Sequence, residues 1–469
     1  MAAVGQDLYF ATIGELNQML TSRQISAVEL ARAFSKRMEQ LGPRYNALAL
    51  PLSQEAYRQA KQVDQDIKRG RLRGPLQGIP YGVKDLLAFA GQPTTWGARP
   101  YAGQVFNYNA AVIDRLAHVG AVLTAKLAMI ELAGGGGYRY ASASLTGPGL
   151  NPWDRTRWTG GSSSGSAAAV AAGLATFAIG SETSGSIVTP ASYCGVTALR
   201  PTYGLVSRYG AMALSWTLDK LGPFAHSAED CGLVLQVIAG GDQRDPGSAG
   251  KSFYYTPQYA RPVKDLRIGY AAPDFAPPAF AAALDVWKET GVQLVETRLP
   301  DFPYGSVLST ILNGEMGSIF EPLIASGKVD ELEDAPQIAG LKASLEVAAK
   351  DYLKAMRIRR LIQQEISKLY GDVDVLLAPG RPGPATKTDE PLDRSSGRAG
   401  RPASGGLRSM IQAGNLAGLP ALVLPCGFVD NLPVAVQLMG VPFSENTLFA
   451  LGREFQKRTD WHKRRPPGV

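Results

Sequence analysis

The chain has 469 residues, of which 45% are hydrophobic and 19% charged, and it contains 52 glycines and 32 prolines. This composition is typical of a globular protein with many tight turns and excludes the disordered and fibrous classes. The formal net charge of +7 is dispersed except for a basic group at Lys457, Arg458, Lys463, Arg464 and Arg465. We interpret this group as a solvated tail and expect no nucleic-acid partner, because nucleic-acid binding needs a continuous basic face.

The sequence has no run of about 18 apolar residues, and its first residues lack the basic and apolar regions of a secretory signal. We therefore predict a cytoplasmic protein without a membrane partner. The three cysteines, Cys194, Cys231 and Cys426, are far apart and have no histidine nearby. Neither a disulfide framework nor a metal site is expected, and no cofactor is implied.

Two amphipathic helices are predicted near the start of the chain. Residues 25–41 place apolar side chains at helical spacing, and Ser26 with Glu29 matches a capping box. A second helix is expected at about 54–69. The segment GPLQGIPYGVKDLL then predicts a turn and a short apolar strand. Lys84 is therefore expected at the end of a strand.

Two glycine- and serine-rich loops lie in the middle of the chain. Before them, residues 110–130 predict a helix, a glycine break and a buried strand, which is the alternation typical of an α/β sheet. The loops occupy 160–166 and 181–186, and between them SAAAVAAG predicts a helix and LATFAIG a buried strand. Because the loops flank one helix–strand unit, we expect them to bracket a site.

The remainder of the chain carries fewer signals. Residues 231–365 alternate helix and strand patterns, and a long helix is predicted at 340–370. Residues 378–406 are rich in Pro, Gly and Arg, and we interpret them as a loop or a lid over the site. The segment NLAGLPALVLPCGF predicts a strand, and a helix is expected near 443–457.

The catalytic base cannot be assigned to a histidine on sequence grounds. Only His118, His226 and His462 are present, and none is near a glycine-serine loop in the sequence, so a Ser-His-Asp triad is disfavoured. Lys84 is the remaining candidate; the alternative is an ordinary surface lysine. The apolar residues before it predict burial, which lowers the pKa of a lysine, and lysine with serine is a known triad variant.

The loop SETSGS at 181–186 offers successive main-chain N–H groups. Its small residues leave these groups free to converge on one point, where they could hold the oxyanion of a tetrahedral intermediate. One such donor is worth about 3–4 kcal/mol in characterised enzymes. The loop at 160–166 brings hydroxyl groups to the start of a helix, to cap it or to relay a proton. Each loop alone is typical of a flexible turn; the pair favours a catalytic site.

These segments resemble the amidase signature family over most of the chain. GGSSSGSAAAVAAG and SETSGS are similar to the family's serine- and glycine-rich core, GPLQGIPYGVKDLL to its lysine motif, and NPWD and NLAGLPALVLPCGF to its flanking segments. The spacing from Ser162 to Ser186 also fits. The resemblance implies an α/β fold with a large mixed, twisted sheet of about eleven strands, covered on both faces by helices.

The chain exceeds the usual size of a single hydrophobic core, but no internal repeat or linker divides it. We predict one amidase signature domain over residues 1–469. It would comprise an N-terminal helical segment, the catalytic core, a variable substrate-pocket region and the C-terminal part of the core, at 1–70, 71–230, 231–405 and 406–469.

Carried over residue by residue, the resemblance implies a catalytic triad without a metal. Ser186 would be the acylated nucleophile, Ser162 the bridging serine after a non-proline cis peptide, and Lys84 the general base. Ser163 would support the triad through hydrogen bonds. Main-chain N–H groups would form the oxyanion hole, from Thr183, Ser184, Gly185 and Ser186.

Departures from the family pattern bear on the substrate. Many members carry an arginine shortly after the nucleophile, which in some meets an acidic substrate, whereas this chain has Val188 and Thr189. We therefore expect a hydrolase for small, neutral or apolar amides. Esters and carbamates (urethanes) present a similar carbonyl and are further candidates. The expected enzyme is a monomer or homodimer.

The alternative is the glutamine-hydrolysing A subunit of a tRNA-dependent amidotransferase complex. In those proteins an acidic residue shortly before the NLAGLP segment helps to hold glutamine, whereas this chain has Arg408 in about that position. The stand-alone amidase is therefore the first interpretation and the amidotransferase component the second. A catalytically silent scaffold is disfavoured because all three triad residues are present.

Overall fold

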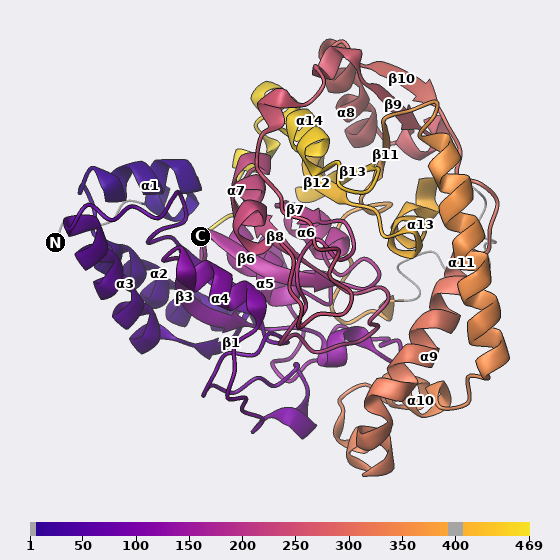
Figure 1. The fold of residues 1–469 in the computed structure, drawn as a ribbon, viewed down its shortest axis with the longest axis horizontal. Helices are drawn as coiled ribbons and strands as arrows, with labels where there is room; N and C mark the ends of the chain where they lie inside the picture. Colours follow the sequence, from indigo (N-terminus) through magenta and orange to yellow (C-terminus); the bar gives the residue numbers. More distant parts are fainter. Residues whose placement is uncertain (1–5, 393–406) are drawn as a thin grey trace.

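The structure, a computed structural model, describes residues 6–392 and 407–469. Within these ranges the α-helices, labelled in Figure 1, are α1 Ile13–Thr21, α2 Ala27–Leu41, α3 Ser53–Lys68, α4 Ala111–His118, α5 Ser164–Ala171, α6 Val188–Cys194, α7 Ala228–Ile238, α8 Pro278–Glu289, α9 Tyr304–Ala325, α10 Ala335–Ser344, α11 Ala349–Leu369, α13 Met410–Ala417 and α14 Glu445–Arg458. The strands are β1 Leu48–Pro51, β2 Pro80–Lys84, β3 Val122–Leu127, β4 Leu150–Asn151, β5 Asp154–Trp158, β6 Phe177–Glu182, β7 Thr197–Arg200, β8 Lys220–Ala225, β9 Arg267–Tyr270, β10 Gln293–Glu296, β11 Val375–Pro379, β12 Ala421–Val429 and β13 Leu432–Gly440.

Eleven of the described strands form one mixed sheet. Their order is β1-β3-β2-β6-β8-β7-β12-β13-β11-β9-β10, and β4 pairs with β5 separately. The strands β3, β2 and β6 run parallel to one another, as do β11, β9 and β10, and the other neighbours pair antiparallel. The mixed sheet of about eleven strands that the family resemblance implies is therefore confirmed.

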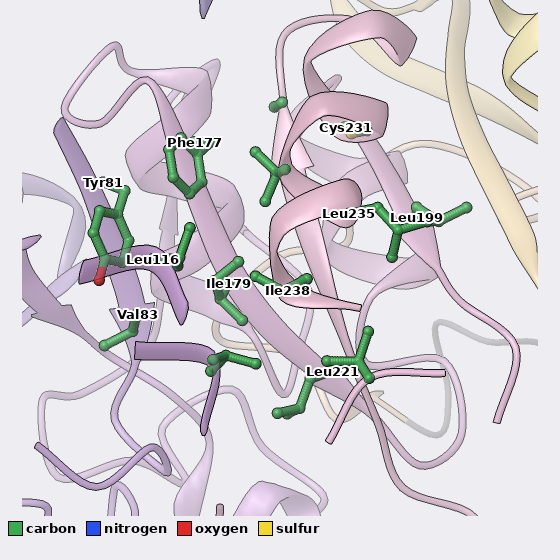
Figure 2. Close-up of a cluster of buried hydrophobic side chains, with 14 of the residues drawn as sticks. Tyr81, Val83, Leu116, Phe177, Ile179, Leu199, Leu221, Cys231, Leu235 and Ile238 are labelled. Carbon is green, nitrogen blue, oxygen red and sulfur yellow. The ribbon is translucent and has the colours of Figure 1, made fainter. Parts of the chain in front are cut away.

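Helices cover both faces of this sheet. Successive side chains of a strand point to opposite faces, and on β6 Phe177 and Ile179 pack in one core with Leu235 and Ile238 of α7 (Figure 2). The intervening Ala178 packs in a second core with the alanines of α5 and with α6. Small residues on α5 allow this helix to lie close to the strands that carry the site.

Several elements predicted from local sequence patterns are present in the structure. Ser26 Oγ accepts a hydrogen bond from the Glu29 N–H at 3.1 Å, and the Glu29 carboxylate accepts one from the Ser26 N–H at 2.9 Å, so the capping box begins α2. The strand β2 ends at Lys84, and α5 and β6 occupy the unit between the two loops.

The long helix predicted at 340–370 corresponds to α11, but its predicted start is wrong, because α11 begins at Ala349 and the residues up to Ser344 belong to a separate helix, α10. Both pack against α9. The chain leaves helical geometry before α11, where Ala348 has ψ of 136°. Residues 345–348 contain no glycine or proline, so the sequence has no local mark of the break.

The segment predicted as a loop or lid is described only as far as residue 392. It continues from β11, and the Trp158 N–H donates to the Thr386 carbonyl at 2.7 Å, which fixes its first part beside β5. Residues 393–406 lie outside the described part of the chain. None of the helices within 6–392 and 407–469 is long and apolar enough to cross a membrane.

Candidate active site

Lys84 lies at the end of β2, between β3 and β6 in the sheet. Its side chain is 0% exposed, and its Nζ lies 2.7 Å from Ser162 Oγ, a residue 78 positions away in the chain. Ser162 lies just before α5 and follows a cis Gly161–Ser162 peptide bond. The structure thus brings the predicted base and the predicted bridging serine into direct contact.

Two further hydroxyl groups contact the lysine. Nζ lies 3.1 Å from Ser163 Oγ and 2.9 Å from Ser181 Oγ. Ser163 Oγ donates its proton to the Ser181 carbonyl and accepts from the Ser181 N–H, so it can only accept from Lys84. A neutral amine has two N–H donors and one lone pair. Donation to Ser163 and Ser181 leaves that lone pair for the Ser162 hydroxyl.

Ser181 is a site residue that the sequence analysis did not assign. It is the penultimate residue of β6, two positions before the loop that carries the predicted nucleophile Ser186. The available signal was its neighbourhood, because parallel strands such as β2 and β6 end at the same edge of a sheet. A polar side chain at the end of the strand next to Lys84 was therefore a candidate contact.

The surroundings of Lys84 favour its neutral form. Burial lowers the pKa of Lys84 from 10.5 to about 7, although the negative charges of Asp219 and Glu182 act in the opposite direction. An unperturbed lysine would be almost entirely protonated at neutral pH and could not accept a proton. Near neutral pH a substantial fraction of the Lys84 side chains is therefore neutral and able to accept a proton.

We expect kcat/KM for amide hydrolysis to rise with pH through about 7 and to level off above it. The reason is that the protonated amine has no lone pair, and the lowered pKa of Lys84 places its deprotonation near neutrality. Initial rates between pH 5.5 and 9, with circular dichroism at each pH as a control for folding, test this. A profile that is flat between pH 6 and 9 would contradict it.

Ser186 lies on the loop that connects β6 to α6, and it is 9% exposed. Within the described ranges Ser186 Oγ makes no hydrogen bond to Ser162, so the structure places the predicted nucleophile on the adjoining loop without joining it to the predicted relay. Catalytic hydrogen bonds are often long in unliganded enzymes and tighten when substrate binds. The contact from Ser162 to Ser186 therefore remains a prediction.

The main-chain N–H groups predicted as oxyanion donors are free to bind a ligand. Within the described part of the chain, none of residues 183–186 donates its N–H to a protein acceptor. The next two N–H groups, of Ile187 and Val188, donate to Glu182 Oε2 at 2.9 and 3.0 Å. Gly185 has φ of +89°, which disfavours any residue with a Cβ. The loop thus presents successive unpaired donors beside Ser186.

A buried ion pair between Glu182 and Arg200 supports the 181–186 loop. Glu182 Oε1 accepts from Arg200 Nη1 at 2.9 Å and from Asn415 Nδ2 at 2.8 Å, and all three side chains are 0% exposed. Burial alone would raise the pKa of Glu182, but the charge and hydrogen bond of Arg200, the charge of Lys220 and the hydrogen bond from Asn415 together outweigh it and lower the pKa to about 2. The charged Glu182 carboxylate therefore links β6, β7 and α13 to the first turn of α6.

Replacing Arg200 by methionine is expected to lower the free energy of unfolding by about 3–5 kcal/mol, because it leaves the Glu182 charge buried without its cation. Urea denaturation at pH 7 measures this difference. Arg58→Met is the matched control: Arg58 pairs with Glu55 but its side chain is 73% exposed, so a loss under about 1 kcal/mol is expected. Equal losses in both variants would contradict the assignment.

Two further sequence predictions concern Arg408 and the expected absence of a metal site. Arg408 lies in the short 3-10 helix Leu407–Ser409, but its side chain is outside the described part of the structure. Within residues 6–392 and 407–469, no group of three His, Cys, Asp or Glu side chains could hold a metal ion. The described site therefore consists of hydroxyl, amine and main-chain N–H groups.

Comparison with known proteins decides the family. The family model described as Amidase matches residues 29–449. This chain belongs to the amidase family. The A subunit of the glutamyl-tRNA(Gln) amidotransferase of Carboxydothermus hydrogenoformans is 35% identical to this amidase, over 98% of this chain and 99% of its own. Further relatives of 35–37% identity carry the same description.

Solved structures of both kinds of relative resemble this amidase. The peptide amidase from Stenotrophomonas maltophilia is 30% identical, with a TM-score of 0.85 over 97% of this chain and 98% of its own. The A subunit of the glutamyl-tRNA(Gln) amidotransferase from Thermotoga maritima is 27% identical, with a TM-score of 0.78 over 98% and 97%. The expected family and fold are confirmed. The curated relatives favour the amidotransferase alternative over the stand-alone amidase.

Proposed function

We propose that this amidase hydrolyses the C–N bond of a carboxamide through an acyl-enzyme on Ser186. The observation that carries the proposal is the contact of 2.7 Å between the buried Lys84 Nζ and Ser162 Oγ. This contact lies beside Ser181, where the loop with free main-chain N–H groups begins. A base, a hydroxyl relay and oxyanion donors are the parts that acyl transfer needs.

The first half of the reaction forms the acyl-enzyme. Neutral Lys84 accepts a proton from Ser162 Oγ, which takes one from Ser186 Oγ as this oxygen attacks the amide carbonyl carbon. The negative carbonyl oxygen of the tetrahedral intermediate is held by the N–H groups of residues 183–186. The proton then returns through Ser162 to the amide nitrogen, and the C–N bond breaks to release ammonia or an amine.

The second half repeats these transfers with water. A water molecule gives a proton to Ser162, and through it to Lys84, as its oxygen attacks the ester carbonyl of the acyl-enzyme. The proton then returns to Ser186 Oγ, and the carboxylic acid leaves. Esters and carbamates contain a carbonyl carbon that the same acyl transfer can attack, so we include them among the candidate substrates.

Two substrate classes are supported by different observations. The curated relatives are named as the A subunit of glutamyl-tRNA(Gln) amidotransferase, and they support glutamine as the substrate and a multisubunit complex as the partner. The curated relatives support the amidotransferase component more strongly than they support a stand-alone amidase. The peptide amidase, with its TM-score of 0.85, supports a stand-alone amidase with a small-molecule substrate.

A substrate panel separates the two classes. L-Glutamine, primary alkyl amides, p-nitroanilides and aryl carbamates are each incubated with the wild type and with Ser186→Ala, and the released ammonia, amine or phenol is measured. Faster turnover of glutamine than of every neutral amide supports the amidotransferase component, and the reverse order supports the stand-alone amidase. If no substrate shows turnover that depends on Ser186, the proposed reaction is wrong.

A further inference from the structure

A cavity of about 400 Å³ opens beside the candidate active site. Two of its lining residues belong to the site: Ser181, whose Oγ lies 2.9 Å from Lys84 Nζ, and Thr183, the first of the candidate oxyanion donors. The cavity is therefore one side-chain contact away from the base. Pockets for small ligands commonly have volumes of about 300–1,000 Å³, and an engineered apolar cavity of about 150 Å³ holds benzene.

The walls of this cavity are mainly apolar. Leu86, Met212, Leu214 and Leu221 line it and are at most 7% exposed, whereas Trp216 is 43% exposed. Apolar walls with few polar groups suit an aryl or alkyl substituent, which gains free energy by leaving water. The indole of Trp216 is exposed to solvent, so we place it at the mouth.

Each of the charged side chains in the lining is already engaged within the protein. Arg208 pairs with Asp245, at 2.7 Å between Nη2 and Oδ1, and Arg244 pairs with Asp242 at 2.9 Å. The remaining acid, Asp219, accepts three hydrogen bonds, which come from the N–H groups of Leu214 and Ser215 and from Thr183 Oγ1. A charged substituent would have to break one of these interactions to be paired, and burying an unpaired charge is costly. The lining therefore favours a neutral group.

The same hydrogen bonds fix the wall of the cavity relative to the 181–186 loop. Asp219 joins Thr183 of this loop to the main chain of Leu214 and Ser215. Farther along the wall, the Trp216 carbonyl accepts from Tyr203 Oη at 2.7 Å and from Arg208 Nη1. The wall main chain is thus held at both ends, so a group bound in the cavity has a defined position relative to the site.

We propose that this cavity is the specificity pocket of the enzyme, and that it takes a neutral aryl or medium-length alkyl group attached to the scissile amide. Met212 and Leu214 form its wall and Trp216 limits its mouth. The inference rests on the proposed function, since the pocket affects turnover only if the neighbouring Lys84 and Ser186 act on the amide. It predicts substrates that are apolar and uncharged at this position.

The test compares two substrate series that differ by single methylene groups. One series is p-nitroanilides of straight-chain acids with two to eight carbons, and the other is acetamides N-substituted with straight alkyl chains of up to eight carbons. In at least one series kcat/KM is expected to rise about fourfold per methylene until the cavity is filled. No rise in either series would overturn the inference.

Variants assign the effect to this cavity. Met212→Trp fills it and is expected to lower the ratio of kcat/KM between the longest and shortest substrates at least tenfold. Trp216→Ala widens the mouth and should raise kcat/KM for branched chains relative to straight ones, which also covers the case in which Met212→Trp does not fold. The control Leu353→Trp adds the same ring on α11, at a position 60% exposed, and should leave the ratio unchanged.

The outcomes separate this inference from the proposed function. If the shortest amide is turned over by the wild type but not by Ser186→Ala, and chain length has no effect, only the pocket is wrong. An unaltered length dependence in both pocket variants, or faster turnover of L-glutamine than of every neutral amide, also overturns the pocket alone. If no amide shows turnover that depends on Ser186, the proposed function fails first.

Discussion

The variant Ser186→Ala is expected to lose amide hydrolysis by a factor of about 10⁴ to 10⁶. Alanine removes the oxygen that attacks the carbonyl but keeps the main-chain N–H, so the oxyanion donors and the fold should persist. The variant should also lose covalent modification by a fluorophosphonate, which adds a defined mass to the nucleophilic serine. Steady-state kinetics and mass spectrometry of the intact protein measure the two effects.

The matched control for this variant is Ser192→Ala. Ser192 lies on α6, and its Oγ donates to the Val188 carbonyl at 2.7 Å, so its removal should leave labelling and turnover within about tenfold of the wild type. Peptide mapping of the labelled protein adds a second check. A label on Ser162 in the wild type, or hydrolysis by Ser186→Ala above a thousandth of the wild-type rate, would refute the assignment of the nucleophile.

The variant Lys84→Met is expected to lower kcat for amides by about 10³ to 10⁴, which is the upper part of the range for the loss of a general base. Methionine is apolar and similar in length, so it fills the buried position without leaving a charge. The comparison of kcat for this variant and the wild type is made above pH 8, where the lowered pKa of Lys84 leaves most of the wild type deprotonated.

Lys84→Arg distinguishes a base from a positive charge. Arginine keeps a cation at this position but does not deprotonate in proteins, so it should be as inactive as methionine if Lys84 accepts a proton. Thermal unfolding of both variants reports whether the fold survives. Turnover by Lys84→Arg within tenfold of the wild type would contradict the role of Lys84 as base.

Much of the site could be predicted because its signals are local. The apolar run before Lys84 fixed both its strand and its burial, and the small residues of the 181–186 loop indicated free N–H groups. The capping box at Ser26 and Glu29 similarly gave the start of α2. In each case the residues that determine the structure are neighbours in the sequence, so pattern and propensity were sufficient.

The contacts that hold the site together could not be predicted in this way. Glu182 and Asn415 are separated by 233 residues, and nothing near either one indicates the other. The same holds for Asp219 and Thr183, which lie just beyond the Glu182–Lys220 pair where the antiparallel strands β6 and β8 meet. The break between α10 and α11 likewise has no glycine or proline to mark it in the sequence. Such features are determined by tertiary structure.

The hydrogen bonds from Ile187 and Val188 to Glu182 have a consequence for the energetics of catalysis. Because the Glu182 carboxylate accepts from the two N–H groups just after the predicted nucleophile, we expect the N–H groups before it to be oriented before substrate binds. Dipoles that are set in advance need no reorganisation when charge develops on the substrate. If residues 183–186 form the oxyanion hole, the buried Glu182 carboxylate therefore helps to lower the activation barrier.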